Sequence, residues 1–286
     1  MTPSVPSRGT RYNGGAPASL ASPWRMPPVI AVGTSGYQYS DWKGAFYPDS
    51  LPKGGELEYY AEHFSTVELN FTYYRMPSFR TIETMVKKTP PGFTFWVKAN
   101  EATTHQQDRS VAAAFNEAMA PAREAGRLAG VLCQFPYSFR NTERNRAYLA
   151  TLAEDFPQDP LVVEFRNAQW ANQAVFRFLR ANRLGFCCVD EPALPGLMPR
   201  VAVATAPVAY LRFHSRDAGK WYEGGGKERY NYLYRRDELE EWLPKVRHLA
   251  SEAGNVYIFF NNCHAGHAAV NAEEFKRLLA DLGVIR

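Results

Sequence analysis

The 286-residue sequence has little of what identifies several common protein classes at sight. It contains four cysteines and no Cys-x-x-Cys pair, which argues against a disulfide scaffold or a cysteine-rich zinc module. No apolar stretch approaches the roughly 18 residues that would indicate a transmembrane helix, so we expect no membrane association. A Walker phosphate loop, a dinucleotide fingerprint and a Gly-x-Ser-x-Gly nucleophile elbow are also missing. The chain therefore indicates neither a nucleotide-dependent enzyme nor a serine hydrolase.

Charge of one sign is also scarce, since the formal net charge is only +4 and 22% of the residues are charged. A nucleic-acid binder usually concentrates basic residues on one face, and the sequence shows no basic run longer than two residues, such as Arg235–Arg236. We expect a small-molecule substrate, while nucleic acid stays open as a partner; no cofactor is indicated. The cysteines lie in or just after apolar runs, which favours reduced, buried thiols and a cytoplasmic protein.

The first 28 residues differ in composition from the rest of the chain. They are rich in proline, serine, glycine and alanine, carry three arginines and contain no acidic residue. They also lack the continuous apolar segment of a secretory signal. We expect residues 1–28 to form a flexible, disordered tail, followed by one domain over residues 29–286.

Hydrophobic residues make up 45% of the chain, and many of them occur in short runs separated by stretches with helical spacing. The runs are VIAVG at 29–33, VELNF at 67–71, FTFWVK at 93–98, VLCQF at 131–135, LVVEF at 161–165, GFCCVD at 185–190, VAYLRF at 208–213 and VYIFF at 256–260. Runs rich in β-branched and aromatic residues are typical of parallel strands buried on both faces. Eight alternating strand–helix units predict an α/β protein with a single (β/α)₈ barrel, and about 250 residues suffice for it. Among the helices, we expect one over 237–254, and a helix or helix pair over 110–127 that is interrupted near Pro121.

Polar or charged residues stand at or near the carboxyl ends of these runs, where a (β/α)₈ barrel carries its active site. The predicted catalytic residues are Glu68, Glu164, Asp190 and His214. The predicted substrate-binding residues are Asn70, Lys98, Arg166, Arg212 and Asn261, together with Tyr37 and Trp42 from the aromatic loop after the first run. Residues two apart share a face of a strand, so Glu164 and Arg166 should point the same way. The alternative interpretation is structural, because buried ion pairs can also close the top of a barrel.

Paired carboxylates at strand ends are the arrangement that glycosidases use, with one carboxyl protonated and the other ionised. Glu68 and Glu164 are the candidate acid/base pair, and His214 could carry a proton between groups. The arginines and Lys98 would orient an anionic or hydroxyl-rich group. The sequence thus suggests, if the protein is an enzyme, a hydrolase acting on a carbohydrate-like or anionic small molecule.

Two other functions remain open. One is a metal-dependent hydrolase of the apurinic-endonuclease barrel type, with ligands His105, Glu164, Asp190 and His214. Cations predicted for the same mouth would repel a divalent ion, so we expect no metal. The other is a barrel that binds a ligand or nucleic acid without turnover.

Several segments resemble the signatures of one family. These are GTSGYQYSDWKGAFYP, FSTVELNFTYYRMPS, FTFWVKAN with THQQDR, LCQFPYSF, VVEFRNAQW, DEP, YLRFHSR and YIFFNNCHAGHAAVNA. In this order, and spread over roughly residues 29–280, they are similar to the YecE-like proteins, also catalogued as domain of unknown function 72. The resemblance implies a TIM-barrel fold and brings no established reaction.

Overall fold

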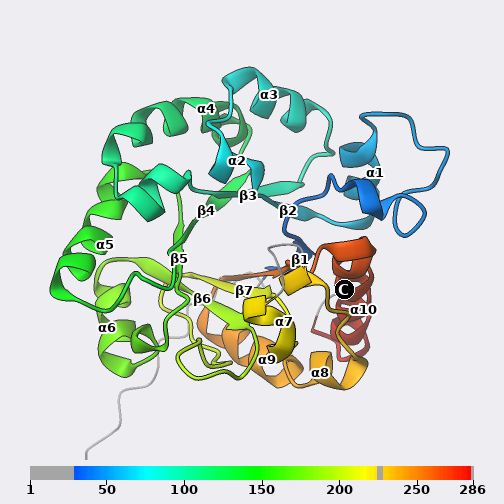
Figure 1. The fold of residues 1–286 in the computed structure, drawn as a ribbon. Coiled ribbons are helices and arrows are strands. Elements are labelled where there is room, and N and C mark those ends of the chain that lie inside the picture. Colours follow the sequence, from blue (N-terminus) through cyan, green and yellow to red (C-terminus); the bar gives the residue numbers. More distant parts are fainter. Residues whose placement is uncertain (1–28, 224–227, 285–286) are drawn as a thin grey trace, which may run out of the picture.

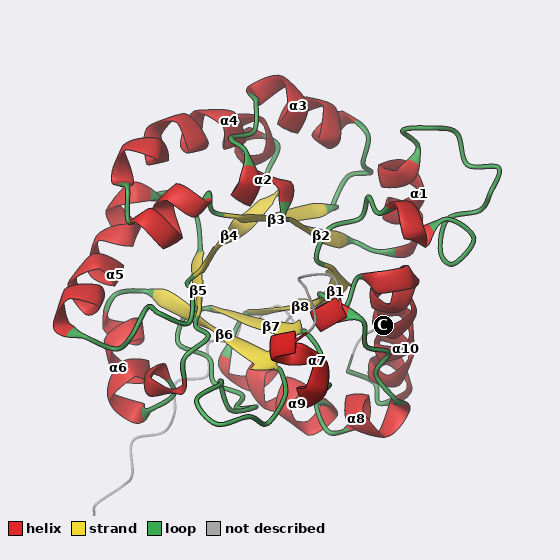
Figure 2. Ribbon diagram, viewed as in Figure 1, coloured by secondary structure: helices red, strands yellow, loops and turns green. Residues whose placement is uncertain are grey.

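The structure, a computed structural model, describes residues 29–223 and 228–284, so the tail predicted over residues 1–28 lies outside it. Eight parallel strands form one sheet in the order β1-β8-β7-β6-β5-β4-β3-β2, and helices surround it (Figures 1 and 2). The strands are β1 (Val29–Thr34), β2 (Thr66–Leu69), β3 (Thr94–Lys98), β4 (Leu128–Gln134), β5 (Leu161–Glu164), β6 (Leu184–Asp190), β7 (Val208–Phe213) and β8 (Asn255–Phe260). Each of the eight apolar runs contributes one strand, and the predicted (β/α)₈ barrel is confirmed.

The helices lie outside the ring of strands (Figure 2). They are α1 (Glu56–His63), α2 (Phe71–Tyr74), α3 (Phe79–Lys87), α4 (Ala112–Glu124), α5 (Glu143–Asp155), α6 (Gln173–Ala181), α7 (Ala218–Glu223), α8 (Arg236–Glu240), α9 (Leu243–Glu252) and α10 (His267–Asp281). Ser78, Thr142 and Asn172 begin α3, α5 and α6, and each side chain accepts a hydrogen bond from a backbone N–H of the first turn. In the described part of the chain, no helix is both long and apolar enough to cross a bilayer.

Two helices differ from the prediction, and proline decides both cases. The helix predicted over 237–254 is divided into α8 and α9, with Pro244 in the first turn of α9. A proline there has no N–H to donate to the preceding turn and its ring obstructs the carbonyl four residues earlier, so the first helix ends. Pro121 by contrast lies inside α4, which continues through it. Burial of Phe115, Met119 and Pro121 itself on the inner face offsets the one missing backbone hydrogen bond.

The seam between β1 and β2 closes the barrel by an unusual route. One parallel bridge, between Ser35 and Glu68, joins the two segments of the chain just beyond the end of β1. Below it the hydroxyl of Tyr60 lies in the gap, where it accepts from the Thr34 amide at 2.8 Å and donates to the Thr66 carbonyl at 3.1 Å. A tyrosine hydroxyl thus replaces the backbone hydrogen bond that a regular ladder would make here.

Aromatic rings fill the barrel beneath its carboxyl end. The ring of Trp96 lies 4.6 Å from that of Tyr210 and 5.3 Å from that of Tyr257, measured between centroids. A Cβ atom on Gly130 would stand 2.5 Å from the Trp96 ring and 2.6 Å from the Pro160 carbonyl oxygen, so only glycine leaves room for the indole. Lys98 and Arg212 follow Trp96 and Tyr210 by two residues on their strands, so charged side chains form the next layer towards the mouth.

Candidate functional site at the barrel mouth

Arg212, from β7, holds two carboxylates inside the barrel. Its guanidinium lies 2.7 Å from Glu68 on β2 and 2.5 Å from Glu164 on β5, and 3.2 Å from the Ser35 hydroxyl. The second Glu68 oxygen accepts a hydrogen bond from the Tyr210 hydroxyl at 2.7 Å. Both glutamates and Arg212 are buried, so their charges are compensated by one another and not by water.

Arg166 continues this chain of alternating charges towards a second pair of acids. Its guanidinium lies 2.7 Å from Glu164 and 3.3 Å from Glu191, and the Met198 amide donates to the other Glu191 oxygen at 2.7 Å. Neighbouring Arg166 and Arg212 hold the pKa of Glu164 well below its usual range, against its burial. Burial instead raises the pKa of Glu191 to about 7. Two carboxyl groups that share one arginine therefore differ in protonation near neutral pH.

Glu191 was not among the predicted site residues. The register of β6 explains its position: Val189 lies opposite inward-pointing Arg212, and Glu191, two residues later, shares that side of the chain, whereas Asp190 alternates to the other side. A strand buried on both faces leaves no sequence signal for which side faces the barrel.

His214 lies against the buried acids in its neutral form. Its Nε2 atom is 3.3 Å from Glu164, and the Asn261 side-chain amide donates to its Nδ1 at 3.0 Å. An Nδ1 that accepts a hydrogen bond leaves the proton on Nε2, facing the carboxylate. Burial, reinforced by Arg166, lowers the pKa of His214 to about 3. His214 is thus uncharged near neutral pH, with its Nε2 facing the Glu164 carboxylate.

Lys98, at the end of β3, is a partly exposed cation of the mouth. Its Nζ donates to the Gln134 side-chain oxygen at 2.7 Å and lies 4.0 Å from the centroid of the Tyr73 ring. Burial is the main cause that lowers the pKa of Lys98 to about 7, and Arg212 adds to it. The amine is therefore close to half protonated at neutral pH.

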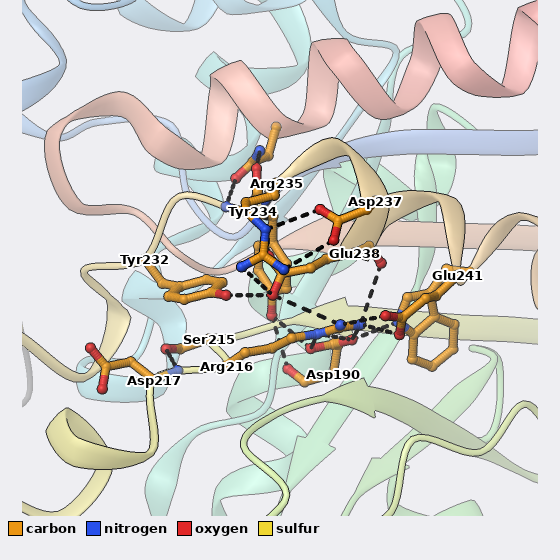
Figure 3. A network of polar contacts seen from close by, with 12 residues as sticks. Asp190, Ser215, Arg216, Asp217, Tyr232, Tyr234, Arg235, Asp237, Glu238 and Glu241 are labelled. Atoms are coloured by element: carbon orange, nitrogen blue, oxygen red, sulfur yellow. Dashed lines mark hydrogen bonds and ion pairs between the residues drawn. The ribbon is translucent and has the colours of Figure 1, made fainter.

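Asp190, predicted as a catalytic residue of the same mouth, lies elsewhere. Its carboxylate accepts hydrogen bonds from Arg216 at 2.7 Å and Tyr234 at 3.0 Å (Figure 3). It also accepts one from the Trp242 indole N–H at 2.6 Å. These partners come from the loop after β7 and from the turn between α8 and α9, outside the barrel. Asp190 therefore does not belong to the cluster of Arg212, and the geometry assigns it to anchoring the loop after β7.

The remaining predicted residues divide between a neighbouring cavity and the core. Tyr37 and Asn70 line a cavity of about 670 Å³ between the aromatic loop and helices α2 and α3, beside the mouth. Trp42 has no exposed surface, and its indole N–H donates to the Cys263 carbonyl at 2.6 Å. The expectation that Trp42 contacts a substrate is therefore not met, because the loop buries this ring in the core.

The four residues of the metal alternative do not converge. Glu164 and His214 are neighbours, but Asp190 lies in the separate cluster and exposed His105 contacts the Tyr73 hydroxyl, with its Nε2 at 3.2 Å. Within residues 29–223 and 228–284, no group of three or more His, Cys, Asp or Glu side chains could hold a metal ion.

Seven predicted residues thus lie together at the carboxyl end of the strands, six of them joined by contacts with one another and Lys98 beside them, in the position that defines the site of a (β/α)₈-barrel protein. They are Glu68, Lys98, Glu164, Arg166, Arg212, His214 and Asn261.

Comparison with known proteins agrees with the resemblance read from the sequence. The chain belongs to the family described as protein of unknown function DUF72, whose model matches residues 31–284. It is 32% identical to the UPF0759 protein YunF of Bacillus subtilis (strain 168), over 88% of this chain and 95% of that protein. A DUF72 family crystal structure from Thermotoga maritima MSB8 is 41% identical with a TM-score of 0.82, over 88% of this chain and 99% of that one. Another, from Enterococcus faecalis V583, is 29% identical with a TM-score of 0.80, over 88% and 96%. None of these descriptions names a reaction or a ligand.

Proposed function

We propose that the protein is an enzyme whose barrel mouth binds a small, anionic, carbohydrate-like molecule and hydrolyses it. The supporting observation is the layering of charge at the mouth. Lys98, Arg166 and Asn261 are partly exposed, whereas the carboxylates of Glu68 and Glu164 lie completely buried beneath them. A ligand that enters the mouth therefore meets cations and an amide first, which favours anionic and hydroxyl groups.

The acid/base assignment that we propose differs from the pair suggested by sequence. Glu164 is held ionised by two arginines, and Glu68 is occupied by Arg212 and Tyr210. A general acid or base works best when its pKa lies near the operating pH. Lys98 meets this condition and is also accessible, so we assign proton transfer to Lys98 and electrostatic support to Glu164. Glu68 then acts as a positioning residue that holds Arg212.

A panel of ligands tests the proposal. Phosphorylated and carboxylated monosaccharides are compared with their neutral parent sugars by calorimetric titration, and each binder is then incubated and its products followed by NMR. The expected result is binding of anionic members only, with water-dependent cleavage of at least one. Lys98→Met should weaken binding about 10–100-fold, since a hydrogen bond to a charged group contributes about 1.5–3 kcal/mol. Lys53→Met is the matched control, because Lys53 is an exposed loop lysine outside the barrel mouth.

Equal affinity for neutral and anionic sugars, or an unchanged affinity in Lys98→Met, would refute the assignment of the mouth. Binding of anions without turnover across the panel would overturn the enzymatic part and favour the non-catalytic barrel.

A further inference from the structure

We propose that Lys98 is a nucleophilic amine, which captures the carbonyl carbon of an anionic aldehyde or ketone as an imine at the barrel mouth. The inference rests on the proposed function only for the place and charge of the ligand. It adds a chemical class, an open-chain carbonyl compound that carries a carboxylate or phosphate, and a covalent step.

The contacts of Lys98 differ from those of a lysine that serves as a structural cation. Among the described residues, no carboxylate forms an ion pair with Lys98, and its hydrogen-bond acceptor is the neutral amide oxygen of Gln134. Other lysines of the chain do have acidic partners, such as Lys87 with Glu83 at 2.8 Å and Lys88 with Glu58 at 2.9 Å. A neutral partner positions the amine without stabilising its charge, which an ionised acid would do.

The surroundings of the amine also favour its uncharged form. Arg212 and Arg166 lie close enough to oppose a further positive charge, and burial acts in the same direction, whereas Glu164 and Glu68 oppose both effects. The face of the Tyr73 ring attracts an ammonium ion, so the charged form is not eliminated. The net effect, a pKa of about 7, leaves a large fraction of neutral amine at physiological pH. A lysine desolvated next to other cations is a recognised way to activate an amine nucleophile.

The step balances without an oxidant or a reductant. The lone pair of Nζ attacks the carbonyl carbon, a C–N bond forms, and the π electrons of the C=O bond move to oxygen. A proton passes from nitrogen to that oxygen, which gives a neutral carbinolamine. A second proton, taken up from solvent, then protonates the hydroxyl group, which leaves as water while C=N forms. The resulting iminium carries the positive charge that the ammonium form of Lys98 carried, so the buried ion pairs of Arg212 need no other change. Arg166, partly exposed at the same mouth, is placed to receive the anionic group.

Reductive trapping tests the inference on the intact chain. The protein is incubated at pH 7 with pyruvate and cyanoborohydride, which reduces only the imine, and the modified lysines are identified by peptide mass spectrometry. The expected result is modification of Lys98 at least about tenfold faster than of exposed Lys53, because a lysine of ordinary pKa has little free amine at this pH. The exposed lysines serve as internal controls in the same digest.

A matched variant separates activation of the amine from mere exposure. Gln134→Glu keeps Lys98 but gives it an ionised partner, so trapping at Lys98 should fall towards the rate at Lys53. If this variant does not fold, the pH dependence in the parent protein decides. Trapping at Lys98 should level off above about pH 7, whereas trapping at a lysine with the reference pKa of about 10.4 would keep rising well above that pH.

Equal rates at Lys98 and Lys53, or a Lys98 profile that rises to the ordinary lysine range, would overturn the inference. If anionic sugars bind as proposed but pyruvate is not trapped at Lys98, the covalent step fails and the proposed function stands. If pyruvate is trapped at Lys98 and no anionic sugar is bound or cleaved, the proposed function fails and the carbonyl chemistry stands.

Discussion

Replacing Arg212 by methionine should reveal how much the charged layer inside the barrel depends on one side chain. Arg212 is buried and pairs with Glu68 at 2.7 Å and Glu164 at 2.5 Å. Arg212→Met leaves two buried carboxylates without this partner, and removal of one member of a buried pair costs about 3–5 kcal/mol. With roughly 2–4 °C per kcal/mol for a chain of comparable size, the melting temperature should fall by roughly 6–20 °C.

Arg236→Met is the matched control, because Arg236 also contacts two carboxylates, Glu240 at 2.9 Å and Glu274 at 3.1 Å, but is 62% exposed. Exposed pairs contribute about 0–1 kcal/mol. Both variants are compared with the parent by urea unfolding from pH 5 to pH 8.

The pH dependence of the Arg212→Met deficit follows from the same carboxylates. Arg212 is one of the groups that hold the pKa of Glu164 low. In the parent, the ionised form of Glu164 therefore stabilises the fold at pH values above the pKa of an unfolded glutamate, about 4.3. Without Arg212, Arg166 is the arginine left to oppose the effect of burial on Glu164, so the ionised form stabilises the fold less and the variant loses stability relative to the parent as pH rises. The deficit should therefore shrink towards pH 5. A deficit below about 1 kcal/mol, or one that does not change with pH, would refute this account of the layer.

Three further substitutions probe single contacts. Tyr60→Phe should lower the free energy of unfolding by about 1–3 kcal/mol and speed hydrogen exchange at the Thr34 amide, because this amide donates to the Tyr60 hydroxyl. Tyr59→Phe should do neither, and equal exchange rates in the two variants would contradict the described role of Tyr60 between β1 and β2. Asp190→Asn should lower stability by several kcal/mol while the folded protein keeps its affinity for anions, since Asp190 anchors a loop; lost affinity without lost stability would restore its catalytic role. Gly130→Ala should lower the free energy of unfolding by about 1–3 kcal/mol and alter the near-ultraviolet circular dichroism of Trp96. Gly254→Ala should do neither, because a Cβ atom there would stand 3.5 Å from the Pro207 carbonyl oxygen, an ordinary contact.

The strands were predictable because a strand buried on both faces leaves a continuous apolar run, as in LVVE of β5. The alternation of side chains also placed Glu164 with Arg166, and Lys98 with them at the same end of the barrel. Asp190 shows where this reasoning fails. A polar residue at a strand end can point inwards or outwards, and only the register of β6 shows that Asp190 points away from the barrel and Glu191 towards Arg166.

The aromatic loop shows a second limit. Its aromatic composition indicates that part of the loop is buried, but composition does not say which ring faces the solvent. Trp42 is buried, and its indole N–H donates to the carbonyl of Cys263, which is more than two hundred residues away in the sequence. Tyr37 stays partly exposed. Such long-range contacts leave no local pattern in the sequence. The shifted pKa values of Lys98 and Glu191 are equally hard to predict from sequence, because they arise from burial and from charges on other strands.

The ionisation of Lys98 tests the central claim most directly. Protein labelled with ¹³C at the lysine ε-carbon is titrated by NMR between pH 5 and pH 11, and Lys98→Arg identifies its resonance. We predict a midpoint of about 7 for Lys98 in the free protein, well below the reference value of about 10.4 for a lysine in a model peptide. A Lys98 midpoint in the ordinary lysine range would contradict both its proposed part in proton transfer and its proposed reactivity towards carbonyl compounds.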